Sequence, residues 1–339
     1  MLPLHTPRLT IRMMTVADAE VHTEYRNDPD VARYQVWEMP YPLERAVASL
    51  ADQATDGQIV RGDWTTMAIE RDGDVIGDVV CHLDEHGAIA EIGYTLARAY
   101  QGHGYATEAA GALVDELFDH VGVRRVVGEL DPENVASMRV LEAVGLQFEV
   151  VTKQSFLWRC EWVDDMHYAV TREEYERWRA RPRGRPSDVR LVEMQPDDVH
   201  LFGRVRTHHS QERFVSPMAL SFRDALFPEV VDGAPLVPWM RGVEADGEPV
   251  GFVMMADATD HLPVPFLWRL LVDRAHQRRG IGGRVIELVA DRLRAQGHRT
   301  LQTSWVPDLP GTPEAFYRGQ GFAVTGEILD GETVGELEL

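Results

Sequence analysis

The apolar residues of this chain repeat in two places with the spacing of a helix that buries one face. After residue 104 they fall at Ala110, Leu113, Val114, Leu117, Phe118 and Val121, and after residue 280 at Ile281, Val285, Leu288, Val289 and Leu293. Because a helical turn takes 3.6 residues, this spacing predicts two amphipathic helices. A predicted strand precedes each helix, over residues 90–96 and 268–273, and a short glycine-containing loop joins strand to helix.

These two strand–loop–helix units are part of a longer internal repeat. The matched segments are 9–19 with 189–199, 74–80 with 248–254, and 101–106 with 277–282. The middle pair are strands that each follow an Asp-Gly turn, as in a hairpin. Three matched pairs in the same order indicate a duplication. We therefore expect two α+β domains around mixed sheets, residues 1–180 and 189–339, joined by a linker over residues 181–188.

Charge and composition narrow the classes of protein. The formal net charge of −21 argues against a nucleic-acid partner. No apolar run reaches the roughly 20 residues that cross a bilayer, and the N-terminus lacks the pattern of a secretory signal. The two cysteines, Cys81 and Cys160, have no metal-ligand or disulfide spacing. We expect a cytoplasmic protein with no membrane partner and no metal, whose acidic surface attracts a cationic ligand or simply maintains solubility.

The two glycine-containing loops have the chemistry of an anion site. A loop between a strand and a helix N-terminus exposes unpaired N–H groups at the positive end of the helix dipole, which suits a phosphate or a diphosphate. Gly104 and Gly280 have no Cβ that would block the approach of the anion. The alternative is a helix start that needs glycine only for its turn. A dinucleotide fingerprint fits poorly, because neither loop follows the first strand of its domain.

Both loops resemble the acyl-CoA signature (Q/R)-x-x-G-x-(G/A) of the GNAT superfamily of acetyltransferases. The matching residues are Gln101, Gly104 and Ala106 in the first half and Gln277, Gly280 and Gly282 in the second. The resemblance implies two GNAT domains, each with a mixed, mostly antiparallel sheet flanked by helices, and acetyl-CoA as cosubstrate without a metal. It places at the cofactor the loop residues Gln101, Gly102, His103, Gly104, Tyr105, Ala106, Gln277, Arg278, Arg279, Gly280, Ile281 and Gly282, with Leu271 and Val272 of the preceding strand.

The first half resembles the branch of the superfamily that contains ribosomal-protein N-terminal acetyltransferases. The resemblance rests on residues 6–12 and on 134–146, which follow the pattern N-x-x-S-x-x-x-L-E-x-x-G-(F/L). It implies that Asn134 holds the pantetheine arm and that Ser137 lies near the thioester sulfur. Helix capping is the alternative role for these two residues. Glu91, on the strand before the loop, is expected to act as a base through water, or else is an exposed strand residue.

The second half resembles the bacterial spermine/spermidine acetyltransferases. The segments that carry this resemblance are 212–217, 268–273, 316–327 and 330–332. Tyr317, four residues before Gly321, matches the general acid of the superfamily, and its alternative role is a buried core aromatic. The corresponding residue of the first half is Leu141, so the two domains cannot share one proton donor.

The second half also departs from the family pattern. Leu267 stands where the first half has Glu91, so its base is unassigned, with Glu212, Asp257 and Glu327 as candidates. Residues 311–314 replace the usual loop-helix asparagine. The pair His208-His209 has no further metal ligand at a suitable spacing.

The expected activity is acetyl transfer from acetyl-CoA to a primary amine, either a polyamine-like small molecule or a peptide N-terminus. In an alternative from another class, one half is a non-catalytic acyl-CoA-binding or scaffolding module. Within the enzymes, antibiotic acetylation and a mycothiol synthase-like activity stay open. Acceptor pockets lie outside the shared motifs, so the sequence does not identify the acceptor, and it gives no oligomeric state.

Overall fold

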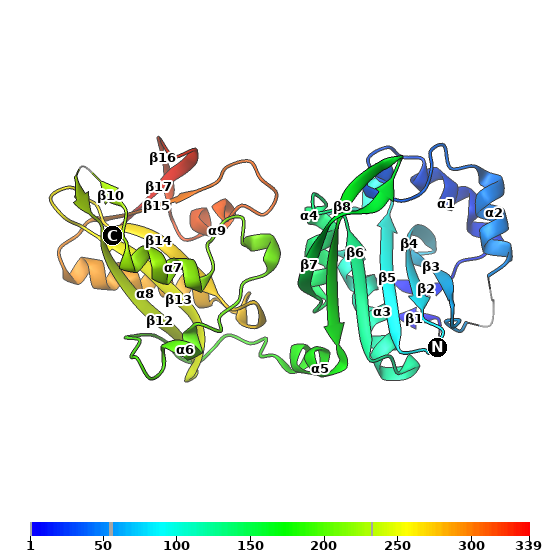
Figure 1. Ribbon diagram of the computed structural model, residues 1–339, viewed down its shortest axis with the longest axis horizontal. Coiled ribbons are helices and arrows are strands. Elements are labelled where there is room, and N and C mark those ends of the chain that lie inside the picture. The colour runs from blue at the N-terminus through cyan, green and yellow to red at the C-terminus, as the bar shows by residue number, and fades with distance from the viewer. Residues whose placement is uncertain (1, 54–56, 232) are drawn as a thin grey trace. The chain divides into compact units, whose positions relative to one another are not determined.

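The chain forms two compact units, Met1–Arg179 and Ala180–Leu339, in the computed structural model (Figure 1). The structure describes residues 2–53, 57–231 and 233–339. Each unit is built on one large sheet with helices against both faces. No helix in the described ranges is long and apolar enough to cross a membrane.

The sheet of the first unit has the strand order β1-β2-β3-β4-β5-β6-β8-β7. Its strands are β1 (Leu4–His5), β2 (Thr10–Met13), β3 (Asp63–Arg71), β4 (Asp74–Leu83), β5 (Ile89–Leu96), β6 (Arg125–Leu130), β7 (Gln147–Trp158) and β8 (Glu161–Thr171). Neighbours pair antiparallel except β5 and β6, which run parallel. The β3–β4 hairpin turns at Asp72 and Gly73, both at positive φ, as the Asp-Gly turn predicts.

Helices of the first unit pack on opposite faces of this sheet. They are α1 (Ala19–Arg26), α2 (Leu43–Ala51), α3 (Tyr105–Glu116), α4 (Val135–Ala143) and α5 (Arg172–Ala180). Alternate residues of β3 point to different cores, because Met67 and Ile69 join the cluster with α3 and α4, while Ala68 joins the cluster with α2. The apolar stripe predicted after residue 104 lies in α3 and the π-helical turn that follows, where Leu113 and Leu117 are fully buried.

The main sheet of the second unit has the strand order β16-β17-β15-β14-β13-β12-β9. Its strands are β9 (Val189–Val192), β12 (Val237–Ala245), β13 (Glu248–Asp257), β14 (Phe266–Val272), β15 (Thr300–Trp305), β16 (Ala323–Leu329) and β17 (Glu332–Glu338); β10 (Val230–Val231) and β11 (Ala234–Pro235) form a separate hairpin. Only β14 and β15 pair parallel among the described strands of this sheet.

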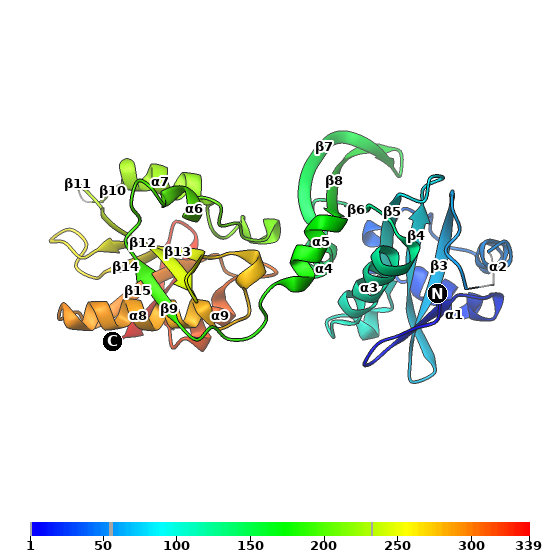
Figure 2. The same ribbon diagram turned by 90° about the horizontal axis from the view of Figure 1, so that it is seen from below.

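Helices cover both faces of the second sheet as well. They are α6 (Val199–Phe202), α7 (Met218–Leu226), α8 (Ile281–Ala295) and α9 (Glu314–Gly319). Figure 2 shows α6 and α7 on one side of β12–β14 and α8 on the other. The core divides accordingly, since Val253 and Met255 of β13 pack with α8 and Phe252 and Met254 with α6 and α7. The α+β class with mixed, mostly antiparallel sheets flanked by helices is therefore confirmed for both domains.

Candidate active sites

The loop of the first unit places a left-handed glycine at the start of a helix. Gly104 is the N-cap of α3 with φ 80° and ψ 8°, and Gly102 has φ 78° with open space where a Cβ would be. The N–H groups in the first turn of a helix have no partner within the helix, so they face outward at this end. Tyr105 is 5% exposed, so its side chain is turned into the core at the start of this helix.

The loop of the second unit repeats this geometry. Gly280 is the N-cap of α8 with φ 80° and ψ 4°. Arg278, the counterpart of Gly102, also has a positive φ, of 61°. Ile281 is buried, and the Arg279 side chain bonds the carbonyl of Gly184 and lies beside His276 and Asp246. As in the first unit, backbone groups and not these side chains face the loop's outer side. Gly282 packs closely against Phe316, since an added Cβ would lie 3.1 Å from the Phe316 ring, which would have to shift slightly.

The two signature glutamines hold the loops in place. Gln101 Nε2 donates to the carbonyl of Leu96 at 3.0 Å, and Gln277 Nε2 donates to the carbonyl of Val272 at 3.0 Å. Each amide therefore ties its loop to the last residue of the preceding strand. This contact gives the glutamine a structural role in the expected cofactor loop, whatever else it contacts.

An arginine missed at the sequence level lies beside each loop glycine. Arg8 Nη2 is 3.5 Å from the Cβ position of Gly104, and Arg8 Nη1 donates to the carbonyl of His103 at 3.0 Å. Arg185 Nε is 3.7 Å from the Cβ position of Gly280. Guanidinium groups suit phosphate oxygens, so each loop combines a helix N-terminus with a cation. Arg8 lies in the segment that resembles the ribosomal-protein branch, but its distance in sequence from the loop hides the contact.

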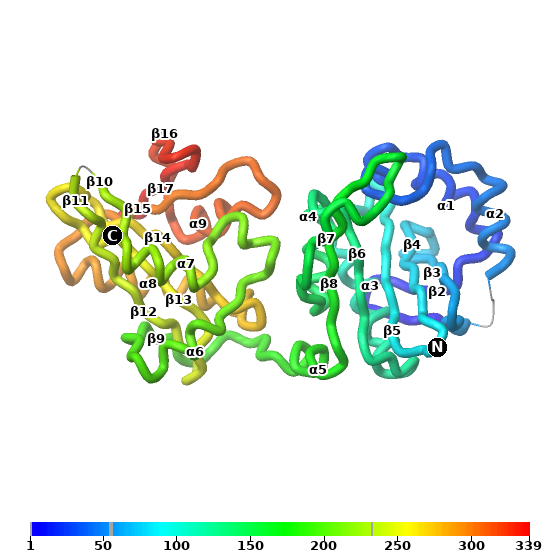
Figure 3. The backbone as a smooth tube through the Cα atoms, viewed as in Figure 1, coloured from blue at the N-terminus to red at the C-terminus, as the bar shows by residue number. Residues whose placement is uncertain are grey.

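A pocket opens where β5 and β6 part in the first unit. The two strands pair only at residues 89–91 and 125–127, after which they diverge. The pocket is lined by Tyr34, Gln35, Ile92, Gly93, Tyr94, Glu129, Leu130, Asn134, Ser137 and Leu141. The tip of the β7–β8 hairpin lies beside the segment after α1 (Figure 3), where Trp158 Nε1 donates to the carbonyl of Gln35 at 3.0 Å. The hairpin therefore fixes one wall of the pocket.

The pocket brings together two of the expected residues. Asn134 is the N-cap of α4, and its side chain accepts a hydrogen bond from the N–H of Ser137 at 3.1 Å. The capping role is therefore present, and both side chains still line the pocket. Ser137 Oγ lies 2.8 Å from the hydroxyl of Tyr94, a β5 residue that sequence reasoning did not select.

Glu91 lies at the last position of β5 that pairs with β6, half-buried beside a row of polar groups on β6 and β8. Burial first, and then the charges of Glu129 and Asp165, raise the pKa of Glu91 to about 7, while His167 opposes the shift. Glu91 is thus neither fully exposed nor an ordinary carboxylate. A group with this pKa can accept and release a proton near neutral pH.

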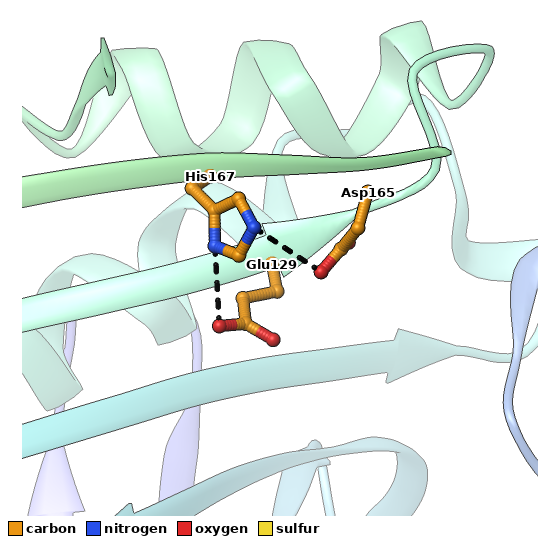
Figure 4. A group of neighbouring side chains, drawn as sticks. All are labelled: Glu129, Asp165 and His167. Carbon is orange, nitrogen blue, oxygen red and sulfur yellow. Dashed lines mark ion pairs between the residues drawn. The ribbon is translucent and has the colours of Figure 1, made fainter. Parts of the chain in front are cut away.

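The neighbours of Glu91 form an ion-pair chain (Figure 4). His167 Nδ1 lies 3.3 Å from Glu129 Oε1, and His167 Nε2 lies 3.4 Å from Asp165 Oδ2. Among the residues that the structure describes, these three form the one group of carboxylate and histidine ligands close enough to hold a metal ion. Each ring nitrogen of His167 faces a different carboxylate, so the histidine bridges Glu129 and Asp165. This is the arrangement of ion pairs, whereas metal ligands would direct their donor atoms to one common position.

The second unit has a different set of side chains at its strand opening. Here β14 and β15 pair only at Phe266 and Gln302. Tyr317 of α9 stacks on Trp305, with ring centroids 5.7 Å apart, and burial raises the pKa of its phenol to about 12 against a hydrogen bond with Thr303. Leu267, at the place of Glu91, is 2% exposed and supplies no base.

Two of the three candidate bases of the second unit pair with other side chains, and the third is exposed. Glu212 pairs with His209, Asp257 makes two hydrogen bonds to Arg292, and Glu327 is exposed on β16. Sequence reasoning missed Glu332, whose charge acts on both Tyr317 and Arg269. Trp305, the last residue of β15, pairs with Thr333 of β17, and Leu130, the last residue of β6, pairs with Met166 of β8. Thr333 and Met166 are therefore equivalent, and so are the residues before them, Glu332 and Asp165.

Comparison with known proteins finds the acetyltransferase (GNAT) domain over residues 8–147 and the acetyltransferase (GNAT) family over residues 202–322. The chain is 28% identical over 176 residues to N-acetyltransferase p20 of Bacillus licheniformis, covering 51% of this chain and 97% of p20. It is 32% identical over 175 residues to N-acetyltransferase YnaD of Bacillus subtilis, covering 50% of this chain and 97% of YnaD.

Solved structures that are similar to about half of this chain include two acetyltransferases. A GNAT-family acetyltransferase from Bacillus anthracis matches at 27% identity and a TM-score of 0.46, covering 51% of this chain and 99% of that one. Mycobacterium smegmatis RimJ in complex with CoA-disulfide matches at 25% identity and a TM-score of 0.46, covering 51% and 87%. On the two domain matches and the likeness to YnaD, the chain belongs to the GNAT family of acetyltransferases and carries two domains of that family in tandem.

Proposed function

We propose that this protein is an acetyl-CoA-dependent N-acetyltransferase that transfers the acetyl group to a primary amine, and that both domains bind the cosubstrate. The observation that carries the proposal is the loop geometry. In each domain a glycine at φ 80° caps a helix, an arginine lies beside it, and the preceding strand leaves its parallel neighbour. This arrangement suits the diphosphate of coenzyme A in the loop, with its pantetheine arm in the strand opening.

In the N-terminal domain, Glu91 is proposed as the base. An alkylammonium group has a pKa of about 10.4, so at pH 7 the amine arrives protonated and cannot attack a thioester. Glu91, with a pKa near 7, takes this proton directly or through water. Holding amine and thioester together lowers the entropic barrier without a covalent enzyme intermediate. Backbone N–H groups of the open strands, such as that of Val272 in the second domain, are proposed to stabilise the oxyanion.

The acceptor of the N-terminal domain is proposed to be cationic, as a polyamine-like molecule or a peptide N-terminus is. Glu91, Glu129 and Asp165 place three carboxylates beside the strand opening, and His167 is the basic side chain among them. The net charge of −21 favours the encounter with such a ligand.

A second candidate function for the C-terminal domain, binding of acetyl-CoA without fast turnover, is favoured by the burial of Leu267. Without a carboxylate at this position, the domain has no counterpart of Glu91. It either uses Glu332, from the neighbouring strand, or it binds acetyl-CoA without fast turnover. In both alternatives the loop of the C-terminal domain binds acetyl-CoA, and they differ in whether Tyr317 takes part in a reaction.

The first test is a calorimetric titration of the full-length protein with CoA, which should give two sites per chain. Free-thiol release from acetyl-CoA is then followed with a panel of amines that includes spermidine, a peptide with a free N-terminus and an aminoglycoside. Acceleration by at least one amine is expected. Absence of CoA binding at either loop would remove that domain from the proposal.

The Tyr317→Phe substitution should lower turnover in the C-terminal domain by about 100-fold, the lower end of the range for loss of a general acid, with acetyl-CoA affinity within about twofold of the unchanged protein. Only the hydroxyl is removed, so the stacking on Trp305 is kept. The measurement uses a chain whose N-terminal loop carries Gly104→Glu. The matched control is Tyr100→Phe. Unchanged turnover would exclude Tyr317 from the chemistry, and no turnover before the substitution would identify the domain as a binding module.

A further inference from the structure

The two domains carry equivalent positions that can be matched by their backbone contacts. Gln101 and Gln277 bind the carbonyls of Leu96 and Val272, so the strands β5 and β14 align with Tyr94 opposite Leu270. At the end of α4 and α9, the N–H of Leu146 donates to the carbonyl of Leu141, and that of Phe322 donates to that of Tyr317. Gly145 and Gly321 follow these helices at φ 104° and 97°.

This alignment shows that the aligned strand and helix positions carry one phenol in each domain, supplied from opposite sides. In the C-terminal domain the helix carries Tyr317 and the strand carries Leu270. In the N-terminal domain the strand carries Tyr94 and the helix carries Leu141, which is buried and packs where Gly128 has no side chain. Leu141 has no proton to offer, and the hydroxyl-bearing residues that β5 and α4 contribute to the pocket lining are Tyr94 and Ser137.

The Tyr94 hydroxyl is in contact with two acceptors on one residue. It lies 2.8 Å from the carbonyl oxygen of Ser137 and 2.8 Å from Ser137 Oγ. A phenol has one proton, so two arrangements exist. When Tyr94 donates to the carbonyl, the Ser137 hydroxyl donates its hydrogen bond to the phenol oxygen of Tyr94. When Tyr94 donates to Oγ, the serine proton is free to point into the pocket.

We propose that Tyr94 is a positioning residue that directs the Ser137 hydroxyl proton to the leaving sulfur of acetyl-CoA in the N-terminal domain. This inference rests on the proposed function, which puts the pantetheine arm in the strand opening, where Ser137 lines the pocket. Arrival of the thioester supplies a new acceptor, and the chain Tyr94 Oη–H···Ser137 Oγ–H···S replaces the resting arrangement. A serine without this partner has a hydroxyl free to rotate among several acceptors.

The reaction step balances without ionising Tyr94. The amine nitrogen forms the C–N bond, the C–S bond breaks, and its electron pair stays on sulfur, which accepts the hydrogen bond from Ser137. The proton lost by the amine goes to Glu91 and then to solvent, and the thiolate takes one proton from solvent as CoA leaves. Burial raises the pKa of the Tyr94 phenol, which keeps its proton in place as a donor throughout.

The test compares CoA with desulfo-CoA, an analogue that lacks the sulfur, by calorimetry. The full-length chain carries Gly280→Glu, so that only the N-terminal loop binds. At pH 9.5 a thiol with an ordinary pKa of about 8.5 is ionised, which strengthens any hydrogen bond to it. Tyr94→Phe should weaken CoA binding about 5- to 10-fold at pH 9.5, about twofold at pH 7, and desulfo-CoA binding less than twofold at both.

The control and the kinetics separate this role from a merely structural one. Tyr175→Phe, which removes a phenol that binds Asp115, should change neither affinity. In turnover, Tyr94→Phe should lower kcat about 10-fold with the acetyl-CoA KM unchanged, and the double variant with Ser137→Ala should be no slower than Ser137→Ala alone.

Equal loss of CoA and desulfo-CoA affinity, or no loss of either, would overturn the role of Tyr94 while leaving the cofactor site intact. Failure of both molecules to bind the chain with Tyr94 unchanged would overturn the proposed function of the N-terminal domain and this inference with it.

Discussion

The Gly104→Glu substitution should weaken acetyl-CoA binding to the N-terminal domain by at least about 100-fold. Two effects add. A side chain at φ 80° is strained by roughly 1–2 kcal/mol, and a carboxylate about 4 Å from a phosphate opposes it by about 4 kcal/mol near a protein surface before salt screening. The new carboxylate also lies within reach of Arg8, which already pairs with Glu108 at 2.6 Å, and it adds negative charge beside this pair.

Glycines elsewhere provide the matched controls. Gly122 has φ 88° and open space around its Cβ position, and it lies beyond the C-terminal end of α3. Gly122→Glu therefore has the same backbone strain as Gly104→Glu but lies outside the loop of residues 101–106. For the second domain, Gly280→Glu pairs with Gly297→Glu, which also lies at φ 88° in open space. Each loop substitution should remove one of two CoA sites and each control neither, as counted by calorimetry. Loss of affinity in a control of the same size as at the loop would mean that strain alone explains the result.

The sequence predicts the parts of these sites that depend on local geometry. The Asp-Gly turns, the strand–loop–helix order and the glycines at the helix starts are set by neighbouring residues, and all are present in the structure. The equal φ of Gly104 and Gly280 follows from the same short pattern. The capping of α4 by Asn134 is equally local, since donor and acceptor are three residues apart.

Other parts depend on which strands are neighbours, and alternation of apolar residues does not reveal this. Asp165 and His167 reach Glu129 because β8, and not β7, pairs with β6. Glu332 has the corresponding place only once β17 pairs with β15. Tyrosine is common in strands, so the sequence does not single out Tyr94. Its contact with Ser137 exists because β5 and β6 stop pairing after residue 91.

The Glu91→Gln substitution should lower N-terminal turnover about 100-fold at pH 7.5, the lower range for loss of a general base. In the unchanged protein kcat/KM should rise with pH up to about 7, where Glu91 ionises, and then stay level until the free amine loses its proton near pH 10. The variant needs amine that is already neutral, so its kcat/KM should keep rising tenfold per unit and most of the deficit should be gone by pH 10. A variant profile parallel to that of the unchanged protein would contradict this role.

The same substitution should make the domain more stable, which separates loss of a base from misfolding. The folded pKa of Glu91 is raised from 4.5 to about 7, so between these values the folded state keeps a proton that the unfolded state has released. The free energy of unfolding therefore falls as pH rises through this window, and the cost is complete above pH 7. Glutamine carries no charge, so Glu91→Gln should gain stability above pH 7, on the order of 1 kcal/mol for this partly exposed group.

Urea unfolding at pH 5 and pH 8 measures this gain, with Glu85→Gln, at an exposed turn glutamate, as the control. The Glu91→Gln advantage should be larger at pH 8 than at pH 5, because at pH 5 the folded protein still holds the carboxyl neutral. The control should show no such difference. Higher stability together with lower turnover would mean that the fold tolerates a costly carboxylate at this strand for the sake of its chemistry. Lower stability at pH 8 would instead assign Glu91 a structural role in the β5–β6 region.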